Sequence, residues 1–83
     1  MKHVLYFTAD WCNPCKKVKP IVEEINQDST VKFKIIDVDS EIELAKSFDI
    51  NSVPTFILFE DGNVINRISG AQTKEKLLGF INE

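Results

Sequence analysis

Three segments at the start of the chain constrain the fold most, because two strand-like runs flank a helical repeat. Residues 3–8 are rich in β-branched and aromatic side chains and too few for a helix, which predicts a buried strand. Residues 31–38 predict a second strand. Between them, a helix ending near Gln27 is predicted from apolar residues at helical spacing: Val18, Ile21, Val22 and Ile25. The chain therefore begins with a strand-helix-strand unit.

The second half of the sequence predicts a short helix, a β-hairpin and a closing helix. The pair Asp61-Gly62 indicates the hairpin, because it supplies the residues that a tight turn needs. Ser40 and Thr73 are candidate N-caps for the two helices. The expected elements are a helix from Ser40 to about Phe48, a loop over 50–54, strands over 55–59 and 63–68, and a helix after Thr73 with an apolar stripe of Leu77, Leu78 and Ile81 flanked by Phe80.

Length and composition narrow the class of protein. The 83 residues support one domain, 1–83, and the element order predicts an α/β fold with a four-stranded mixed sheet flanked by three helices. The formal charge of −3 without a basic stripe argues against nucleic-acid binding. The apolar run over residues 4–7 is too short for a signal segment or a membrane span. We therefore expect a cytoplasmic protein that contacts no membrane.

Cys12 and Cys15 are the residues best suited to carry chemistry. A pair separated by two residues does not form the long-loop framework that staples small secreted domains. The pair follows the first predicted strand and begins the first predicted helix, where exposed N–H groups and the helix dipole favour a thiolate at Cys12. The spacing brings both sulfurs to bonding distance and keeps the second more buried. We predict that Cys12 attacks a disulfide and that Cys15 resolves the mixed disulfide.

The segments around and after these cysteines resemble the thioredoxin family. A CxxC pair alone is a weak signal, but the combination is specific and runs in family order over nearly the whole chain. The resemblance implies the thioredoxin fold and the reduction of protein disulfides by a monomer without a cofactor. The segments that carry it are Ala9-Asp10-Trp11-Cys12-Asn13-Pro14-Cys15-Lys16, Pro20, Val53-Pro54-Thr55, Asp61-Gly62 and Gly70-Ala71.

The resemblance also implies a substrate-binding surface. Trp11 is expected to flank the reactive sulfur, and Val53-Pro54 to form a cis peptide whose Val53 backbone pairs with an extended substrate segment. Gly70 is expected to let a partner backbone approach, or simply to end the preceding strand. The expected partners are disulfide-containing proteins as substrates, and a thioredoxin-reductase-like protein or a low-molecular-weight thiol as electron donor.

The sequence departs from the family pattern in two ways. It begins without the strand and helix that precede the first strand in typical thioredoxins, which is expected to expose residues 31–38 as a sheet edge. Thioredoxins usually hold a buried aspartate six positions before the attacking cysteine, thought to take the proton of the resolving thiol. Tyr6 stands at that position, and Ile35 stands where a matching lysine is usual.

These substitutions change the expected chemistry of the site. A phenol, with an ordinary pKa near 10, is a poor base at neutral pH. The proton of Cys15 is therefore expected to leave through water, a backbone group or an exposed acid, of which Asp10 is the nearest in sequence. Asn13 replaces the glycine that is more usual in thioredoxins, and the two inner residues, Asn13 and Pro14, are expected to tune the redox potential.

Three other kinds of function share features with this sequence: a glutaredoxin, a metal or cluster site, and a docking subunit. Glutaredoxins share the fold, but the sequence lacks their aromatic residue before the second cysteine and their late Gly-Gly pair. A structural zinc site needs four ligands, and besides the cysteines the chain offers only His3, so we expect no metal unless two chains share a cluster. A non-catalytic docking subunit that uses the surface around Trp11, Pro54 and Gly70 stays open as an alternative.

Overall fold

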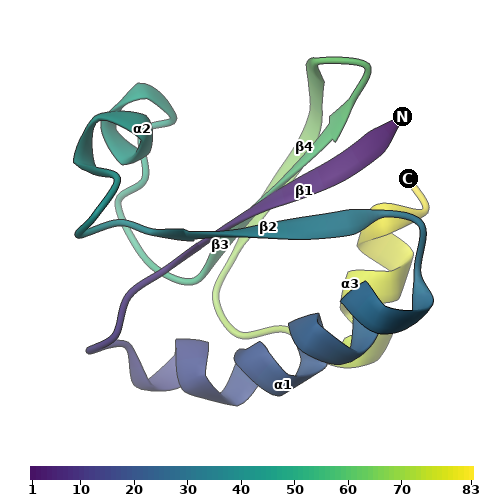
Figure 1. Ribbon diagram of the computed structural model, residues 1–83, viewed down its shortest axis with the longest axis horizontal. Helices are drawn as coiled ribbons and strands as arrows, with labels where there is room; N and C mark the ends of the chain where they lie inside the picture. Colours follow the sequence, from purple (N-terminus) through teal and green to yellow (C-terminus); the bar gives the residue numbers. More distant parts are fainter.

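The polypeptide folds as a mixed β-sheet with helices on both faces (Figure 1). The computed structural model describes residues 1–83. The sheet contains four strands and is flanked by three helices, which confirms the predicted α/β architecture. In chain order the elements are β1 (Lys2–Thr8), α1 (Asn13–Asp28), β2 (Lys32–Asp37), α2 (Ile42–Ser47), β3 (Thr55–Glu60), β4 (Asn63–Ser69) and α3 (Lys74–Ile81).

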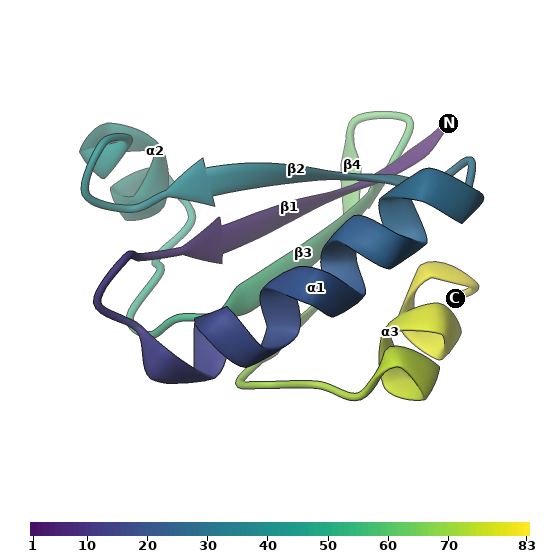
Figure 2. The same ribbon diagram turned by 60° about the horizontal axis from the view of Figure 1, so that its bottom comes forward.

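The strand order across the sheet is β2-β1-β3-β4. Strand β1 pairs in parallel with β2 and antiparallel with β3, and β3 pairs antiparallel with β4. Strand β2 is therefore an edge strand, as the sequence predicted. Because β1 and β2 run in the same direction, their carboxyl ends lie at the same end of the sheet (Figure 2). The segment that contains the cysteines follows β1 at this end.

The two faces of the sheet are covered by different helices. Helices α1 and α3 lie together on one face, whereas α2 lies on the other (Figure 2). The alternation of side chains along β1 produces this division, because residues two apart in a strand point to the same face. Val4 and Tyr6 pack with buried residues of α1 and α3. Phe7 packs instead with Ala45 of α2.

The start of α2 differs from the sequence prediction. The helix begins at Ile42, and its N-cap residue is Glu41, whose side chain makes no capping hydrogen bond. The N–H groups of Ser40 and Glu41 both donate to the carbonyl oxygen of Asp37, at 3.2 and 2.8 Å. The prediction that Ser40 caps the helix is wrong, because the chain first makes a backbone-bonded turn at the end of β2.

The last helix confirms one prediction and corrects another. Thr73 caps α3, since its Oγ1 accepts a hydrogen bond from the Lys76 N–H at 3.1 Å. The buried face consists of Leu77, Phe80 and Ile81, whereas Leu78 is 37% exposed. Spacings of three and four residues place the buried side chains on one side of a helix. Phe80 therefore belongs to the core stripe, and Leu78 flanks it.

The hairpin between β3 and β4 forms at the predicted turn. Asp61 and Gly62 both have left-handed backbone conformations, with φ of 52° and 86°. Two consecutive positive φ angles match the twist of the flanking strands, which is why Asp-Gly favours this turn. Residues 50–54 form the predicted loop before β3, and this loop reaches the cysteines.

Candidate active site

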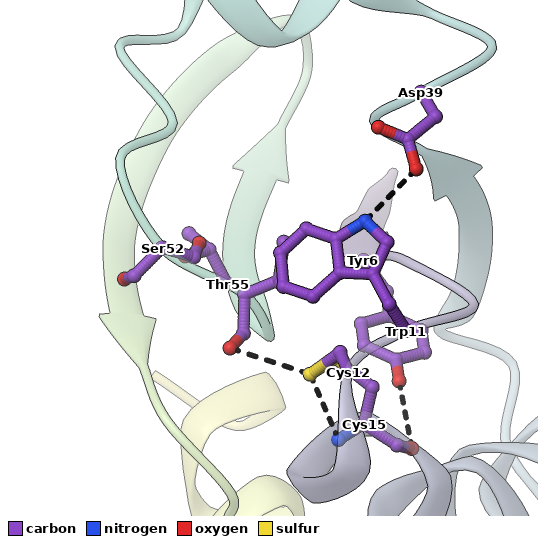
Figure 3. Close-up of a disulfide and its surroundings, with 8 residues drawn as sticks. Tyr6, Trp11, Cys12, Cys15, Asp39, Ser52 and Thr55 are labelled. Carbon is purple, nitrogen blue, oxygen red and sulfur yellow. Dashed lines mark hydrogen bonds between the residues drawn. A yellow bond between two sulfur atoms is a disulfide. The ribbon is translucent and has the colours of Figure 1, made fainter.

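The two cysteines lie at the junction of β1 and α1. Cys12 is the N-cap residue of α1, and Cys15 lies in the first turn of the helix. Figure 3 shows both residues at the start of α1. A disulfide joins them in this structure, with their Cα atoms 5.3 Å apart. This separation lies in the normal range for bridged cysteines. The spacing of the two residues therefore allows their sulfurs to bond, as the sequence predicted.

The start of α1 favours negative charge on Cys12. Its Sγ accepts a hydrogen bond from the Cys15 N–H at 3.2 Å, as a capping oxygen does in other helices. Pro14 lies in the first turn of the helix. Backbone N–H groups there have no partner within the helix, so the lack of an N–H in proline costs no helical hydrogen bond. No acidic residue occupies this turn, and the helix dipole adds partial positive charge. These features stabilise a Cys12 thiolate once the disulfide is reduced.

Both cysteines are largely buried. Cys12 is 4% exposed and Cys15 is 2% exposed. With Ala9 they form a small cluster, against which Val38 and Val53 pack. The predicted difference in burial between the two cysteines is therefore slight in this oxidised form. Their neighbours, which differ on the two sides of the disulfide, distinguish them more clearly.

The loop before β3 brings Val53 next to Cys12. The Val53-Pro54 peptide bond is cis, as the resemblance implied. The carbonyl oxygen of Val53 lies 3.5 Å from Cys12 Sγ. Thr55 Oγ1 donates a hydrogen bond to the carbonyl oxygen of Ser52 at 2.8 Å and thereby holds the loop against the start of β3. The Val53 backbone is thus placed beside the sulfur.

Trp11 forms one wall of an apolar groove near the disulfide. Its side chain is 67% exposed, and its Nε1 donates a hydrogen bond to Asp39 Oδ2 at 3.0 Å (Figure 3). A pocket of about 140 Å³ lies against the ring and is lined by Trp11, Val38, Ile50, Asn51, Ser52 and Val53. The hydrogen bond fixes an aromatic surface at the edge of this pocket. An exposed tryptophan whose orientation is fixed by a hydrogen bond is well suited to bind another polypeptide.

Gly70 follows β4 and lies beside Pro54. Its N–H donates a hydrogen bond to the Pro54 carbonyl oxygen at 2.8 Å. Its φ of 91° is a conformation that favours glycine. A Cβ atom added here would meet no atom within 4 Å, so the space above Gly70 is open. This geometry fits both interpretations of Gly70, as a site of backbone approach and as the end of β4.

Tyr6 lies beneath Cys15 and supports the backbone there. Its hydroxyl donates a hydrogen bond to the Cys15 carbonyl oxygen at 3.3 Å (Figure 3). Its ring stacks on the ring of Phe56. Burial raises the pKa of Tyr6 above its ordinary value of 10.0. The phenol therefore stays protonated at neutral pH. Ile35 is the strand partner of Tyr6 and is 47% exposed, so no lysine neighbours Tyr6 at this position.

Comparison with known proteins decides the family. A family model described as Thioredoxin matches residues 1–83. This chain belongs to the thioredoxin family. Thioredoxin of Mycobacterium tuberculosis (strain H37Rv) is 45% identical over 79 residues, which cover 93% of this chain and 68% of that protein. A Mycobacterium leprae protein named bifunctional thioredoxin reductase/thioredoxin is 43% identical over 79 residues, covering 93% of this chain and 17% of that protein.

Solved thioredoxin structures have the same fold as this chain. Thioredoxin of Fasciola hepatica aligns with a TM-score of 0.91 at 35% identity and covers 98% of this chain and 78% of that one. The oxidised form of mitochondrial thioredoxin 3 from Saccharomyces cerevisiae aligns with a TM-score of 0.89 at 36% identity. The alignment covers 98% of this chain and 76% of that one. The protein is a thiol-disulfide oxidoreductase of the protein-disulfide reductase class, and Cys12 and Cys15 form its CxxC site.

A polar cleft opens on the Cys15 side of this thioredoxin-type site. Its volume is about 280 Å³, and its walls come from β1, the turn after β1, α1 and β2. Acidic and basic side chains both take part. The residues that line it are Tyr6, Thr8, Ala9, Asp10, Cys15, Lys16, Lys19, Ile35 and Asp37.

Asp37 belongs to this cleft, although the sequence interpretation named only Asp10. Asp37 is the last residue of β2 and the strand partner of Thr8. A signal for it was present, because an acid that ends the second parallel strand lies near whatever follows the first. Asp10 also lines the cleft, but it is exposed in the turn after β1. The structure thus places two carboxylates in the walls of the cleft that Cys15 also lines.

The remaining positions of the motif are at the surface. Asn13 and Pro14 are exposed in the first turn of α1, between the two cysteines. His3 stacks on the ring of Phe59, with the ring centroids 5.0 Å apart, and belongs to a different part of the sheet. No group of three or more His, Cys, Asp or Glu side chains is arranged to hold a metal ion.

Proposed function

We propose that Cys12 is the nucleophile and Cys15 the resolving residue in the reduction of disulfides in other proteins. The position of Cys12 carries this assignment. Its sulfur caps α1, where the helix stabilises a thiolate, and it lies 3.5 Å from the carbonyl oxygen of Val53, a residue that lines the groove of Trp11. Cys15 lies one turn into the helix and faces the polar cleft. The first sulfur is therefore the one that a bound protein segment meets.

The reaction consists of two exchanges. The Cys12 thiolate attacks one sulfur of the substrate disulfide, which forms a Cys12-substrate bond and releases the other substrate sulfur as a thiolate. Cys15 then loses its proton and attacks Cys12 Sγ, which forms the Cys12-Cys15 disulfide and releases the second substrate thiolate. Both substrate thiolates take protons from solvent. Two electrons pass from the protein dithiol to the substrate disulfide.

We propose that an extended substrate segment crosses the surface formed by Trp11, Val53, Pro54 and Gly70. The Val53 backbone lies beside Cys12 and suits pairing with an extended chain, a mode in which main-chain hydrogen bonds supply affinity. The open space above Gly70 admits the substrate backbone. The indole of Trp11 supplies apolar contact next to the reacting sulfurs. We assign Tyr6, Asp10, Asn13 and Pro14 to tuning of the two cysteines.

We propose that the chain works as one domain, residues 1–83, and as a monomer in the cytoplasm. Its electron donor would be a thioredoxin-reductase-like protein or a low-molecular-weight thiol. The Mycobacterium leprae relative supports the first, since its name joins a thioredoxin reductase to a thioredoxin in one protein. None of the helices has both the length and the apolar character that crossing a bilayer requires.

Serine variants test the roles of the cysteines. Cys12→Ser should abolish insulin reduction and form no mixed disulfide. Cys15→Ser should also lose turnover but accumulate a covalent protein-insulin adduct, which non-reducing electrophoresis and mass spectrometry would detect. The reverse pattern would exchange the two roles. Loss of cellular function in the double variant would indicate redox work, whereas retained function would indicate docking.

The redox potential then refines the activity. Equilibration with defined thiol buffers, followed by alkylation and mass measurement of free thiols, gives the potential of the pair. A value near −270 mV, as known for thioredoxin, is expected for a general reductant, whereas one near −200 mV would favour a glutathione-linked or isomerising role. The absence of a two-electron transition would contradict the proposed chemistry.

A further inference from the structure

If Cys15 resolves the mixed disulfide, as proposed above, it must lose a proton before it attacks. The thiolate is the reactive species, and a thiol with an ordinary pKa of about 8.5 is mostly protonated at neutral pH. Cys15 is 2% exposed, so bulk water does not surround it. Tyr6 does not accept the proton, because burial raises the pKa of its phenol, which stays protonated, and a neutral phenol is a poor base. An acceptor must lie along the cleft beside Cys15.

The cleft contains both candidate acceptors and room for water. Its volume of about 280 Å³ is far above the roughly 10 to 15 Å³ that a cavity needs to hold one water molecule. A proton can therefore pass from the sulfur to a carboxylate through water. General bases can act in this way, through one bridging water molecule. The charged and titratable side chains that face the cleft are Asp10, Asp37, Lys16, Lys19 and Tyr6.

Asp37 is better placed than Asp10 to receive the proton. It ends β2, is half-buried, and its Oδ1 accepts a hydrogen bond from the Asp39 N–H at 2.8 Å. This bond restrains the carboxylate through Oδ1, and no hydrogen bond within the protein occupies its second oxygen. Asp10 lies in the exposed turn after β1, so its side chain has more freedom to face bulk solvent. The strand and the hydrogen bond hold the Asp37 carboxylate in place, whereas no such restraint holds the Asp10 carboxylate.

We propose that Asp37 accepts the proton of Cys15, through water in this cleft, when Cys15 attacks the mixed disulfide. The S–H bond of Cys15 breaks, and its electron pair forms the bond to Cys12 Sγ. The bond between Cys12 Sγ and the substrate breaks, and the substrate sulfur leaves as a thiolate. Asp37 then passes the proton to solvent at the mouth of the cleft. Asp37 thereby takes over a task that Tyr6 does not perform.

The sign of the charge effect makes this proposal testable. A carboxylate near a thiol disfavours the thiolate by repulsion, so the removal of its charge alone would speed the attack of Cys15. If Asp37 accepts the proton, its removal slows the attack instead. Lys16 and Lys19 favour the thiolate by their positive charge, and they stay in place in the Asp37 variants. Slower resolution in Asp37→Asn therefore separates proton acceptance from a through-space charge effect.

A stopped-flow experiment with the disulfide probe dithiobis(nitrobenzoic acid) observes both exchanges. Attack by Cys12 releases one coloured thionitrobenzoate, and resolution by Cys15 releases a second, so the reduced full chain mixed with equimolar probe gives two phases. The variants are Asp37→Asn, Asp37→Glu, Asp10→Asn and, as a charge-matched control at the far end of α1, Asp28→Asn. The asparagine at 37 retains an oxygen for the Asp39 N–H. Rates are measured from about pH 6 to about pH 10, across the ordinary thiol pKa of about 8.5.

We expect Asp37→Asn to slow the second phase about tenfold at neutral pH, below the hundredfold or more that a base in direct contact contributes. The loss should shrink as the pH passes the ordinary thiol pKa, because hydroxide then removes the proton. Asp37→Glu should restore much of the rate, and Asp28→Asn should match the wild type. A first phase present in every protein would show that Cys12 chemistry is intact, and its absence in the wild type would contradict the proposed function instead.

Three results would overturn the role of Asp37. The second phase of Asp37→Asn could match that of Asp28→Asn at every pH, which would leave proton removal to solvent alone. Asp10→Asn could show the loss in place of Asp37→Asn, which would assign the proton to Asp10. A loss in Asp37→Asn that stays undiminished at about pH 10 would indicate a structural effect.

Discussion

The two sides of the Cys12-Cys15 disulfide differ far more than the exposure of its two sulfurs. On the Cys12 side lie an apolar groove, the exposed Trp11 ring and the Val53 carbonyl oxygen. On the Cys15 side lies a polar cleft with Asp37 in its wall. An apolar surface binds a polypeptide by removing apolar area from water, whereas a cleft lined by charged side chains and large enough for water can transfer protons. The neighbours of each sulfur thus suit one side to recognition and the other to proton transfer.

The largest change is expected when the recognition side is broken. Trp11→Ala removes the aromatic wall of the groove and the hydrogen bond to Asp39. An aromatic hot-spot residue contributes about 2 kcal/mol or more to protein recognition, so kcat/KM for insulin reduction should fall about 30-fold. The rate with the small probe dithiobis(nitrobenzoic acid) should fall much less, because the probe does not need the groove. Trp11→Phe, which keeps an apolar ring, serves as the matched control, and equal losses with both substrates would refute the recognition role.

A smaller effect, on stability, is expected from Tyr6→Phe on the Cys15 side. The substitution keeps the ring that stacks on Phe56 and removes only the hydroxyl that donates to the Cys15 carbonyl oxygen. Loss of one such bond should lower the free energy of unfolding by about 1 kcal/mol, measured by urea denaturation of the oxidised protein. The second phase with the probe should slow far less than in Asp37→Asn. A comparable slowing would make the phenol part of the proton path.

The same tyrosine predicts how stability depends on alkaline pH. Burial raises the pKa of Tyr6 in the folded state, so the unfolded chain releases this proton first as the pH rises. The contribution of neutral Tyr6 to stability is therefore complete below its ordinary pKa of 10.0 and is lost as the pH rises through the folded pKa. Urea denaturation should show wild type losing its advantage over Tyr6→Phe in this range. A constant difference between the two proteins would contradict the raised pKa.

The smallest effect on stability and KM is expected from substitution of Arg67, a β4 residue that supports the loop on the recognition side. Its Nη1 donates to the Phe48 carbonyl oxygen at 2.6 Å and its Nη2 to that of Asp49 at 3.3 Å. These carbonyls precede the loop residues that line the groove. Because the contacts are exposed, Arg67→Met should cost about 0.5 kcal/mol of unfolding free energy and raise KM for insulin more than it lowers kcat. Arg67→Lys keeps the positive charge but lacks the planar guanidinium group, so its unfolding free energy and its KM should lie between those of the wild type and Arg67→Met.

Much of the architecture was predictable because neighbouring residues determine it. The two positive φ angles of Asp61 and Gly62 follow from their short, permissive side chains. Thr73 caps α3 through a hydroxyl three residues from its partner. Cys12 and Cys15 could be assigned to a helix start from the strand-like run before them and the apolar repeat after them. In each case, the interacting groups lie within one turn of the chain.

The sequence by itself determined the element order, the sheet of four strands and the pair of cysteines that reacts. The tertiary structure decided what surrounds each sulfur. Asp37 lines the same cleft as Cys15 only because β2 pairs with β1 in the register that sets Asp37 opposite Thr8. Likewise, Phe80 rather than Leu78 enters the core because α3 docks on α1 and the sheet at one particular rotation. Register and docking depend on packing between distant segments, and no local pattern contains that information.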